Sequence, residues 1–219
     1  MFEQVLGEYC VDRPRAAFLY DISLQLQLQH PSIIKMLGYC TRGIQHVPSP
    51  ADHVLNRQLI SVFEYGEKFK MDIPREFSEE VKLSLDLLDM MDYLSNSPIG
   101  PIFVDDFNDG NLMLMDGHLK IADLEAVWST EERCGHSRGC YHNLECVEGE
   151  CVGHNARRTV EKAKHYLRYW LAPDHSLKYK LSLKKINVLL EDETVRLAQL
   201  RTPIERLHRK ILRKSGERV

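Results

Sequence analysis

Residues 102–125 constrain the fold of this chain more than any other stretch. Two short apolar-rich runs, 112–115 and 118–122, are separated by Asp116-Gly117. An Asp-Gly pair between apolar runs is the strongest local signal for a β-hairpin, because both turn positions need a positive φ angle. The sequence therefore predicts a short two-stranded ribbon that reverses the chain at Asp116-Gly117.

Oxygen-bearing side chains flank this predicted hairpin. Asp106 and Asn111 precede its first strand, and Asp123 follows its second strand. Because a hairpin returns the chain to its starting point, we expect Asp123 to lie close to Asn111 and to the loop before it. Hard divalent cations prefer oxygen ligands, with one or two from protein and the others from water and phosphate. The pattern predicts a site for Mg²⁺ or Mn²⁺ at the open end of the ribbon.

Two other interpretations of the same residues stay open. Asn108-Asp109-Gly110 and Asp116-Gly117 are also typical of ordinary turns, in which case the neighbouring acids are only solvated. A calcium loop fits less well. With Gly110 at the glycine position of such a loop, Phe107 falls where an oxygen ligand is required.

Composition limits the classes of protein that the chain can belong to. The chain has 219 residues, of which 43% are hydrophobic, so it can bury one full-sized core or two modest ones. Its net charge of −3 gives no global basic field and predicts no nucleic-acid partner. No apolar run approaches the roughly 20 residues of a membrane span. The first residues, Met1 to Gln4, contain an acid and no basic segment, so no signal peptide is visible.

Periodicity and turn residues predict an α+β chain. A helix over 16–28 is expected to stop at His30-Pro31, because proline disfavours helix in the residue before it. Ser78 is a predicted N-cap for a helix that ends near Asn96. The remaining expectations are strands over 33–39 and 59–65 and three helices in the C-terminal part, over 155–172, 181–190 and 195–212.

Four cysteines, Cys134, Cys140, Cys146 and Cys151, lie within eighteen residues. So short and polar a stretch buries little apolar surface, which favours disulfides as the links that hold it together. Zinc bound with help from the nearby histidines and free thiols are the alternatives, although the gaps between the cysteines suit zinc poorly. Of three possible connectivities we expect the alternating one, Cys134–Cys146 with Cys140–Cys151. Disulfides would imply an oxidising compartment.

The order of these features resembles a protein kinase. Asp106, four residues, Asn111, a hairpin and Asp123-Leu124-Glu125 are similar to the kinase catalytic loop and metal-binding aspartate. The resemblance implies that Asp106 is the catalytic base, that Asn111 is a metal ligand and that Asp123 is the main metal ligand. Val104-Asp105-Asp106 departs from the usual His-Arg-Asp, and Asp123-Leu124-Glu125 departs from Asp-Phe-Gly.

Two segments nearer the N-terminus extend this resemblance. "LQHPSIIKMLGYC" is similar to the passage from the regulatory helix of a kinase small lobe into its next strand. Glu64-Tyr65-Gly66 resembles a hinge that binds adenine through its backbone. The resemblance divides the chain into a partial small lobe and hinge over 1–66 and a large lobe over 67–219, with a cysteine-rich insert at 134–154.

The cysteine-rich insert and the following "CVGHNARRTVEKAKHYLRYWL" narrow the resemblance to the secreted divergent protein kinases. Within that family the chain resembles the vertebrate lonesome kinase group most, and next the divergent protein kinase-domain (DIPK) group. This implies ATP and Mg²⁺ or Mn²⁺ as cofactors and a protein substrate phosphorylated on tyrosine. It also implies a setting in the secretory pathway, including the Golgi, or outside the cell.

The glycine-rich loop and strand lysine of kinases have no counterpart in this sequence. Asp21 occupies the position of the regulatory-helix glutamate, and Lys35 is the first lysine in the chain. We expect either a truncated product of a longer secreted kinase, which we favour, or a pseudokinase that acts as a binding module. A small-molecule phosphotransferase of the aminoglycoside or choline kinase type is a third hypothesis, because its catalytic loop looks similar to residues 106–125.

Overall fold

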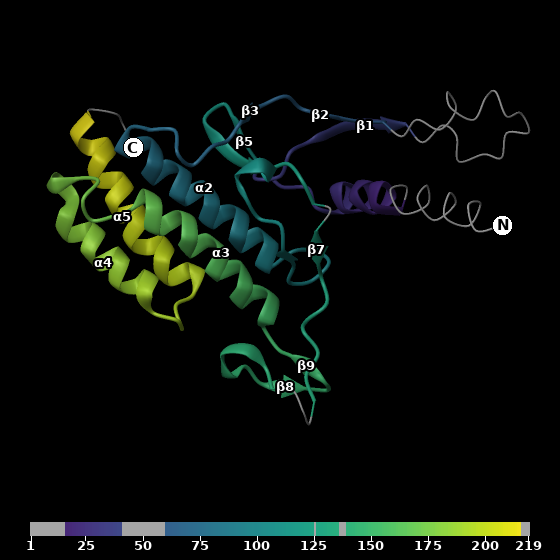
Figure 1. Cartoon of the computed structure of the whole chain (residues 1–219). Coiled ribbons are helices and arrows are strands. Elements are labelled where there is room, and N and C mark those ends of the chain that lie inside the picture. Colours follow the sequence, from purple (N-terminus) through teal and green to yellow (C-terminus); the bar gives the residue numbers. More distant parts are fainter. Residues whose placement is uncertain (1–15, 41–59, 125, 136–138, 216–219) are drawn as a thin grey trace, which may run out of the picture.

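The computed structural model describes residues 16–40, 60–124, 126–135 and 139–215. Four helices form its main body and run side by side in Figure 1. Helix α2 contacts both α3 and α5, and α4 packs against α5 and α3. Their bounds are α2 (Phe77–Ser95), α3 (His154–Trp170), α4 (Lys180–Glu191) and α5 (Leu197–Ser215). These helices match the predicted segments, and a further helix spans residues 16–27.

Short antiparallel strands lie beside the helices, so the predicted α+β class is confirmed. Within the described residues, a three-stranded sheet has the order β3-β5-β6, and three other sheets each have two strands. The strands are β1 (Met36–Cys40) with β2 (Ile60–Phe63), β3 (Glu67–Lys68), β5 (Leu112–Met115), β6 (His118–Ile121), β4 (Phe103–Val104) with β7 (Val127–Trp128), and β8 (Cys146–Val147) with β9 (Glu150–Cys151). None of the described helices is long and apolar enough to cross a membrane.

The predicted hairpin is confirmed as strands β5 and β6. Leu112 pairs with Ile121 and Met115 pairs with His118, so the two strands are in continuous register. The turn residues Asp116 and Gly117 have φ angles of 52° and 73°. Both angles lie in the left-handed region, as a two-residue hairpin turn requires.

Helix α2 begins earlier than the sequence predicted. Its N-cap is Glu76 without a side-chain capping bond, so the prediction that Ser78 caps the helix is wrong. Glu79 and Glu80 in the first turn lie at the positive end of the helix dipole. The helix contacts α3, α5 and β6, which explains why it buries more than one stripe of side chains.

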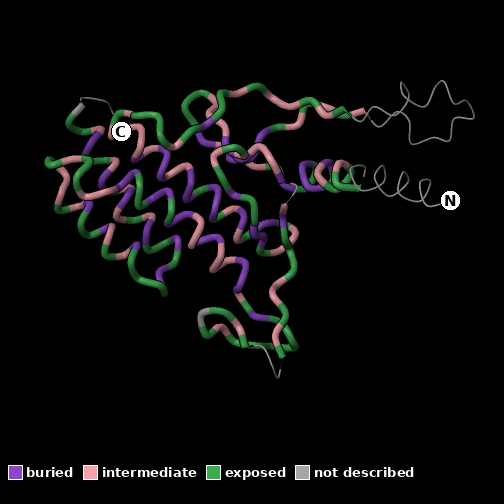
Figure 2. Tube along the Cα trace, in the orientation of Figure 1, coloured by how far each residue is buried: buried purple, intermediate pink, exposed green. Residues whose placement is uncertain are grey.

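The core lies between the helices, as the purple segments on their facing sides show in Figure 2. An aromatic cluster joins this core to the loop before the hairpin. Phe69 meets Trp170 edge-on at 5.9 Å between ring centroids, and Phe107 meets Tyr166 edge-on at 5.5 Å. Edge-to-face pairs of this kind stabilise beyond the area that they bury. The loop that contains Phe107 is therefore anchored on α3.

The segment between helix 16–27 and β1 is fixed against the hairpin. Ile33 forms a parallel bridge with Ile121. The Ile34 N–H donates to the Ile121 carbonyl at 2.9 Å, and the Ile121 N–H donates to the Ser32 carbonyl at 2.9 Å. The His30 ring stacks on Tyr93 of α2, with centroids 4.2 Å apart. Residues 30–34 therefore connect the N-terminal elements to the helical body.

Gly66 is required by close packing against β5. A Cβ atom at this position would lie 2.6 Å from Met115 Cγ and 2.9 Å from the Leu114 carbonyl oxygen. We expect Gly66→Ala to lower the free energy of unfolding by about 1–3 kcal/mol, because the backbone of β5 must move. Gly38→Ala is the matched control, since no atom lies within 4 Å of its added Cβ. Equal denaturation midpoints for the two variants would contradict this account.

Candidate active site

Backbone pairing fixes the start of the loop that contains Asp106. Phe103 and Val104 of β4 pair with Trp128 and Val127 of β7. The Asp105 N–H then donates to the Ala126 carbonyl at 2.9 Å. These bonds hold the chain immediately before Asp106 against the segment that follows the hairpin.

Two asparagines orient the carboxylate of Asp106. Asn108 Nδ2 donates to Oδ1 at 2.6 Å, and Asn111 Nδ2 donates to Oδ2 at 3.2 Å. Asn111 Nδ2 also donates to the Asp106 carbonyl at 2.8 Å. Asp106 itself is exposed. Each carboxylate oxygen therefore has one fixed donor, and the group is held in place at the surface as a hydrogen-bond acceptor.

The amide of Asn108 is itself fixed by a short 3₁₀ turn, Asp109–Asn111. Its Oδ1 accepts from the Gly110 N–H at 2.7 Å, which turns its Nδ2 toward Asp106. A Cβ at Gly110 would lie 2.8 Å from Asn108 Oδ1, so a side chain there would displace the Asn108 amide. The residues Asn108-Asp109-Gly110 do form a turn, and the same turn also orients Asp106.

Backbone contacts bring Asn111 and Asp123 to the same end of the hairpin. The Ala122 N–H donates to the Asn111 carbonyl at 2.8 Å, so Asp123 lies one residue beyond this contact. Leu124 on its other side is fully buried. Asn111 and Asp123 are both half-buried. The chain thus gathers an exposed carboxylate, an amide and a second carboxylate-bearing residue near the open end of the ribbon.

Asp109 ties this loop to two distant elements, a role that the sequence did not reveal. Its Oδ2 accepts from the Met71 N–H at 2.7 Å, and its Oδ1 accepts from the Tyr166 hydroxyl at 3.0 Å. Burial, and then the neighbouring Asp109 carboxylate, raise the pKa of Tyr166 far above its usual value. Tyr166 therefore stays protonated and donates to Asp109, which holds the loop on α3.

The predicted hinge residues lie at the end of β2. Glu64 Oε1 accepts from the Lys35 N–H at 2.8 Å and from Lys120 Nζ at 2.6 Å. Burial raises the pKa of Glu64, but the bond from Lys120, the bond from Lys35 and their charges together lower it below its usual value. The Glu64 N–H donates to the Lys35 carbonyl, so it is not available to a nucleotide. Lys120 was not singled out from the sequence.

The other predicted nucleotide-contacting residues occupy different surroundings. Tyr65 is 90% exposed, and Gly66 packs against β5. Asp21 lies half-buried in the helix over residues 16–27. A role in nucleotide binding for these three residues stays a prediction.

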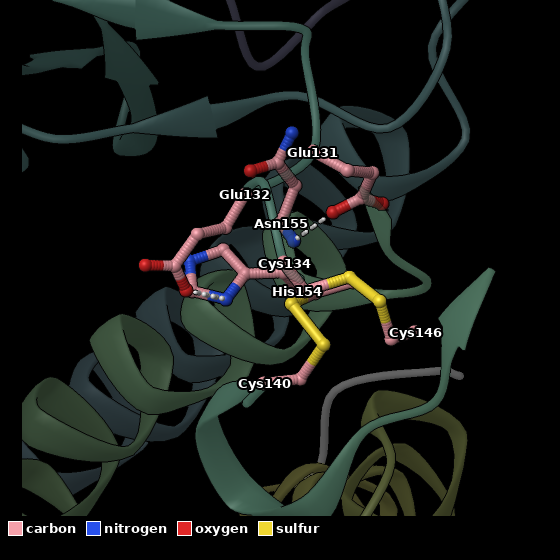
Figure 3. Close-up of a disulfide and its surroundings, with 8 residues drawn as sticks. Glu131, Glu132, Cys134, Cys140, Cys146, His154 and Asn155 are labelled. Carbon is pink, nitrogen blue, oxygen red and sulfur yellow. Dashed lines mark hydrogen bonds and ion pairs between the residues drawn. A yellow bond between two sulfur atoms is a disulfide. The ribbon is translucent and has the colours of Figure 1, made fainter. Parts of the chain in front are cut away.

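The cysteine-rich insert is cross-linked as the sequence predicted. Cys134 is bonded to Cys146 and Cys140 to Cys151, with Cα–Cα distances of 6.0 and 5.5 Å. The alternating connectivity is therefore confirmed. These four sulfurs are not available as zinc thiolates. The close-up in Figure 3 shows the disulfides beside the start of α3, where His154 Nδ1 lies 3.1 Å from Glu132 Oε2.

Asn155, at the start of α3, joins the insert to the loop before Asp106. Its Nδ2 donates toward the carbonyls of Pro101, Trp128 and Thr130 at 3.1–3.4 Å. Its backbone N–H donates to Glu131 Oε2 at 2.8 Å, as Figure 3 shows. Only 2% of Asn155 is exposed. This one side chain therefore fixes the segment before β4 and the segment at the end of β7.

Comparison with known proteins found no matching family model. It did find similarity to the human extracellular tyrosine-protein kinase PKDCC, with 26% identity over 165 residues. The match covers 71% of this chain and 32% of PKDCC, so the chain spans about a third of the length of that relative. The similarity confirms the resemblance drawn from the sequence and supports a kinase-like function. This chain is a distant relative of a PKDCC-like protein.

Proposed function

We propose that this chain is part of an ATP-dependent protein kinase that transfers phosphate to a protein hydroxyl group. One observation carries the proposal. The carboxylate of Asp106 is held by Asn108 and Asn111 at the same end of the hairpin to which the backbone brings Asp123. Transfer of phosphate to a hydroxyl group needs a fixed carboxylate that can accept the hydroxyl proton. It also needs amide and carboxylate oxygens nearby that can bind a divalent cation.

In this proposal, Asp106 acts on the acceptor hydroxyl. One of its oxygens accepts the hydroxyl proton while the hydroxyl oxygen forms a bond to the γ-phosphorus of ATP. The bond between the γ-phosphorus and the bridging oxygen breaks, and ADP leaves with that electron pair. Asn108 and Asn111 keep the Asp106 carboxylate in position during the proton transfer. Orientation of this kind supplies much of the catalysis in phosphoryl transfer.

Asn111 and Asp123 would hold the divalent cation, Mg²⁺ or Mn²⁺. Since Asn111 Nδ2 points to Asp106, its Oδ1 is the end of the amide that can face a cation. An amide oxygen and a carboxylate are the donor types that Mg²⁺ selects. When bound, the ion would neutralise charge on the phosphate oxygens. The residues present therefore fit such an ion in their chemistry.

The remaining features of the proposal rest on the relationship to PKDCC. PKDCC is an extracellular tyrosine-protein kinase, which supports tyrosine as the acceptor and a protein as the substrate. The two disulfides support passage through the secretory pathway, including the Golgi, or an extracellular location. We assign residues 1–66 to a small-lobe portion and hinge and 67–219 to a large-lobe portion, with Tyr65 and Gly66 contacting adenine through their backbone and Asp21 on the regulatory helix.

A non-catalytic binding module is the second candidate function. It is favoured by the departure from His-Arg-Asp at Val104-Asp105-Asp106. Such a module would bind partners through the same fold without transferring phosphate. Turnover measurements on the complete protein separate the two candidates.

Nucleotide binding by the complete protein tests the metal assignment. With MgATP at about 100 times its Kd, binding stabilises the folded state by about 2.7 kcal/mol and raises the melting temperature by several degrees. We expect Asp123→Asn to remove this rise. Asp116→Asn is the matched control, since Asp116 lies in the hairpin turn with a φ angle of 52° that asparagine also adopts. An undiminished rise in Asp123→Asn, with unliganded stability unchanged, would refute the assignment.

A further inference from the structure

A cavity of about 600 Å³ opens beside the loop that contains Asp106. One wall is Phe107, which directly follows Asp106, and a second wall comes from the cysteine-rich insert. The third wall is one face of α3. We call this cavity the cationic pocket, and its lining includes Phe107, Tyr141, Arg158, Lys162, His165 and Tyr166.

The two cations of the pocket are held in place by Phe103 and Asp105, in the segment that precedes Asp106. Lys162 Nζ donates to the Asp105 carbonyl at 2.7 Å. A guanidinium nitrogen of Arg158 lies 3.8 Å from Asp105 Oδ1. Both groups also lie over the Phe103 ring, at 4.7 Å for Arg158 and 5.6 Å for Lys162. Because an ammonium has three N–H donors, Lys162 keeps two beyond the one given to Asp105.

The side chains that line the pocket include two cations, Arg158 and Lys162, and one acid, Glu161, although the whole chain has a net charge of −3. Glu161 also lines the pocket, but its carboxylate lies 3.2 Å from Lys164 and 3.6 Å from Arg157. Two cations therefore compensate Glu161. Among the described residues, Asp105 is the acid that lies against Arg158. Arg158 and Lys162 thus share a single acidic residue, Asp105, as a direct contact.

We propose that the cationic pocket receives an acidic side chain, aspartate or glutamate, of the protein substrate. This inference rests on the proposed function, since it takes the acceptor hydroxyl to lie at Asp106. Asp106 and Phe107 are consecutive residues, and consecutive Cα atoms are about 3.8 Å apart. A substrate hydroxyl at Asp106 is therefore close to the pocket wall that Phe107 forms. An extended peptide advances about 3.3 Å per residue. The acidic residue that enters the pocket therefore lies within a few positions of the acceptor.

Peptide kinetics on the complete protein test the pocket. The probes are peptides with one tyrosine that differ by Glu, Gln or Lys at single positions on either side of it. We expect Glu at one of these positions to lower KM about tenfold relative to Gln, with little change in kcat, as a partly exposed charge-assisted contact allows. The double variant Arg158→Gln/Lys162→Gln should lose this preference, so that its KM values for the Glu and Gln peptides become equal.

Lys178→Gln/Lys214→Gln is the matched control. It also removes two cations that lie over an aromatic ring, at 5.3 and 5.7 Å from the centroid of Tyr179. The control should keep the preference for the Glu peptide. Turnover without a preference for Glu would contradict the role proposed for the pocket, and so would a preference that persists in Arg158→Gln/Lys162→Gln. Neither result would contradict the proposed kinase function.

A binding measurement separates failure of the pocket from failure of the kinase proposal. If no peptide is phosphorylated, the proposed function fails, and fluorescence anisotropy of labelled Glu and Gln peptides then tests the pocket alone. Tighter binding of the Glu peptide by about tenfold, lost in Arg158→Gln/Lys162→Gln, would support the pocket. Equal binding of both peptides would overturn it.

Discussion

Replacing Asp106 by asparagine is expected to lower kcat for phosphotransfer by about 10²- to 10⁴-fold, the usual contribution of a positioned general base. An amide cannot accept the proton of the attacking hydroxyl. It would also place its NH₂ group against one of the two amide donors, Asn108 or Asn111, that now hold the carboxylate. Steady-state kinetics with a tyrosine peptide and MgATP measure the effect.

Two controls make the result for Asp106→Asn specific. Asp116→Asn introduces the same chemical change at the far end of the hairpin and should keep normal turnover. The rise in melting temperature with MgATP should survive in Asp106→Asn, because Asn111 and Asp123 hold the cation in this account. Turnover within about threefold of the unsubstituted protein would remove Asp106 from the mechanism.

The second large effect is expected at Asn155. Its side chain donates to three backbone carbonyls and is only 2% exposed. Asn155→Asp replaces the donors with a carboxylate that faces those carbonyl oxygens in a buried site. We expect the free energy of unfolding to fall by about 3–5 kcal/mol, because a buried charge without a compensating partner is strongly destabilising.

Denaturant unfolding with the disulfides intact measures this loss. Asn143→Asp is the control, since Asn143 is exposed and has a φ angle of 56° that aspartate tolerates. The control should change stability by less than about 0.5 kcal/mol. If Asn155→Asp were as stable as Asn143→Asp, the link between α3 and the segments that frame the Asp106 loop would be wrong.

The sequence predicted those parts of the fold that depend on neighbouring residues. The hairpin followed from Asp116-Gly117, because few residues adopt two consecutive positive φ angles. The C-terminal helices followed from apolar spacing, and the cysteine pairing agreed with the alternating expectation. Ser78 failed as a cap because α2 begins at Phe77, one residue before it.

Contacts between distant residues were not visible in the sequence. Tyr166 and Asp109 are 57 positions apart, and Lys120 and Glu64 are 56 apart. No local pattern links such pairs, because they meet only after the helices and strands have packed. Asn108 was interpreted only as a turn residue, because its contact with Asp106 is not visible in the sequence either. Its donation to Asp106 depends on an amide orientation that the Gly110 N–H sets.

The central claim is that Asn111 and Asp123 hold a divalent cation beside the carboxylate of Asp106. The most direct measurement is the anomalous diffraction of Mn²⁺ in crystals of the complete protein grown with a non-hydrolysable ATP analogue. The account predicts a manganese peak about 2 Å from Asn111 Oδ1 and from a carboxylate oxygen of Asp123. A peak elsewhere, for example in the cavity lined by Asp86, Asp89 and Asp92, with none at Asn111 and Asp123, would contradict it.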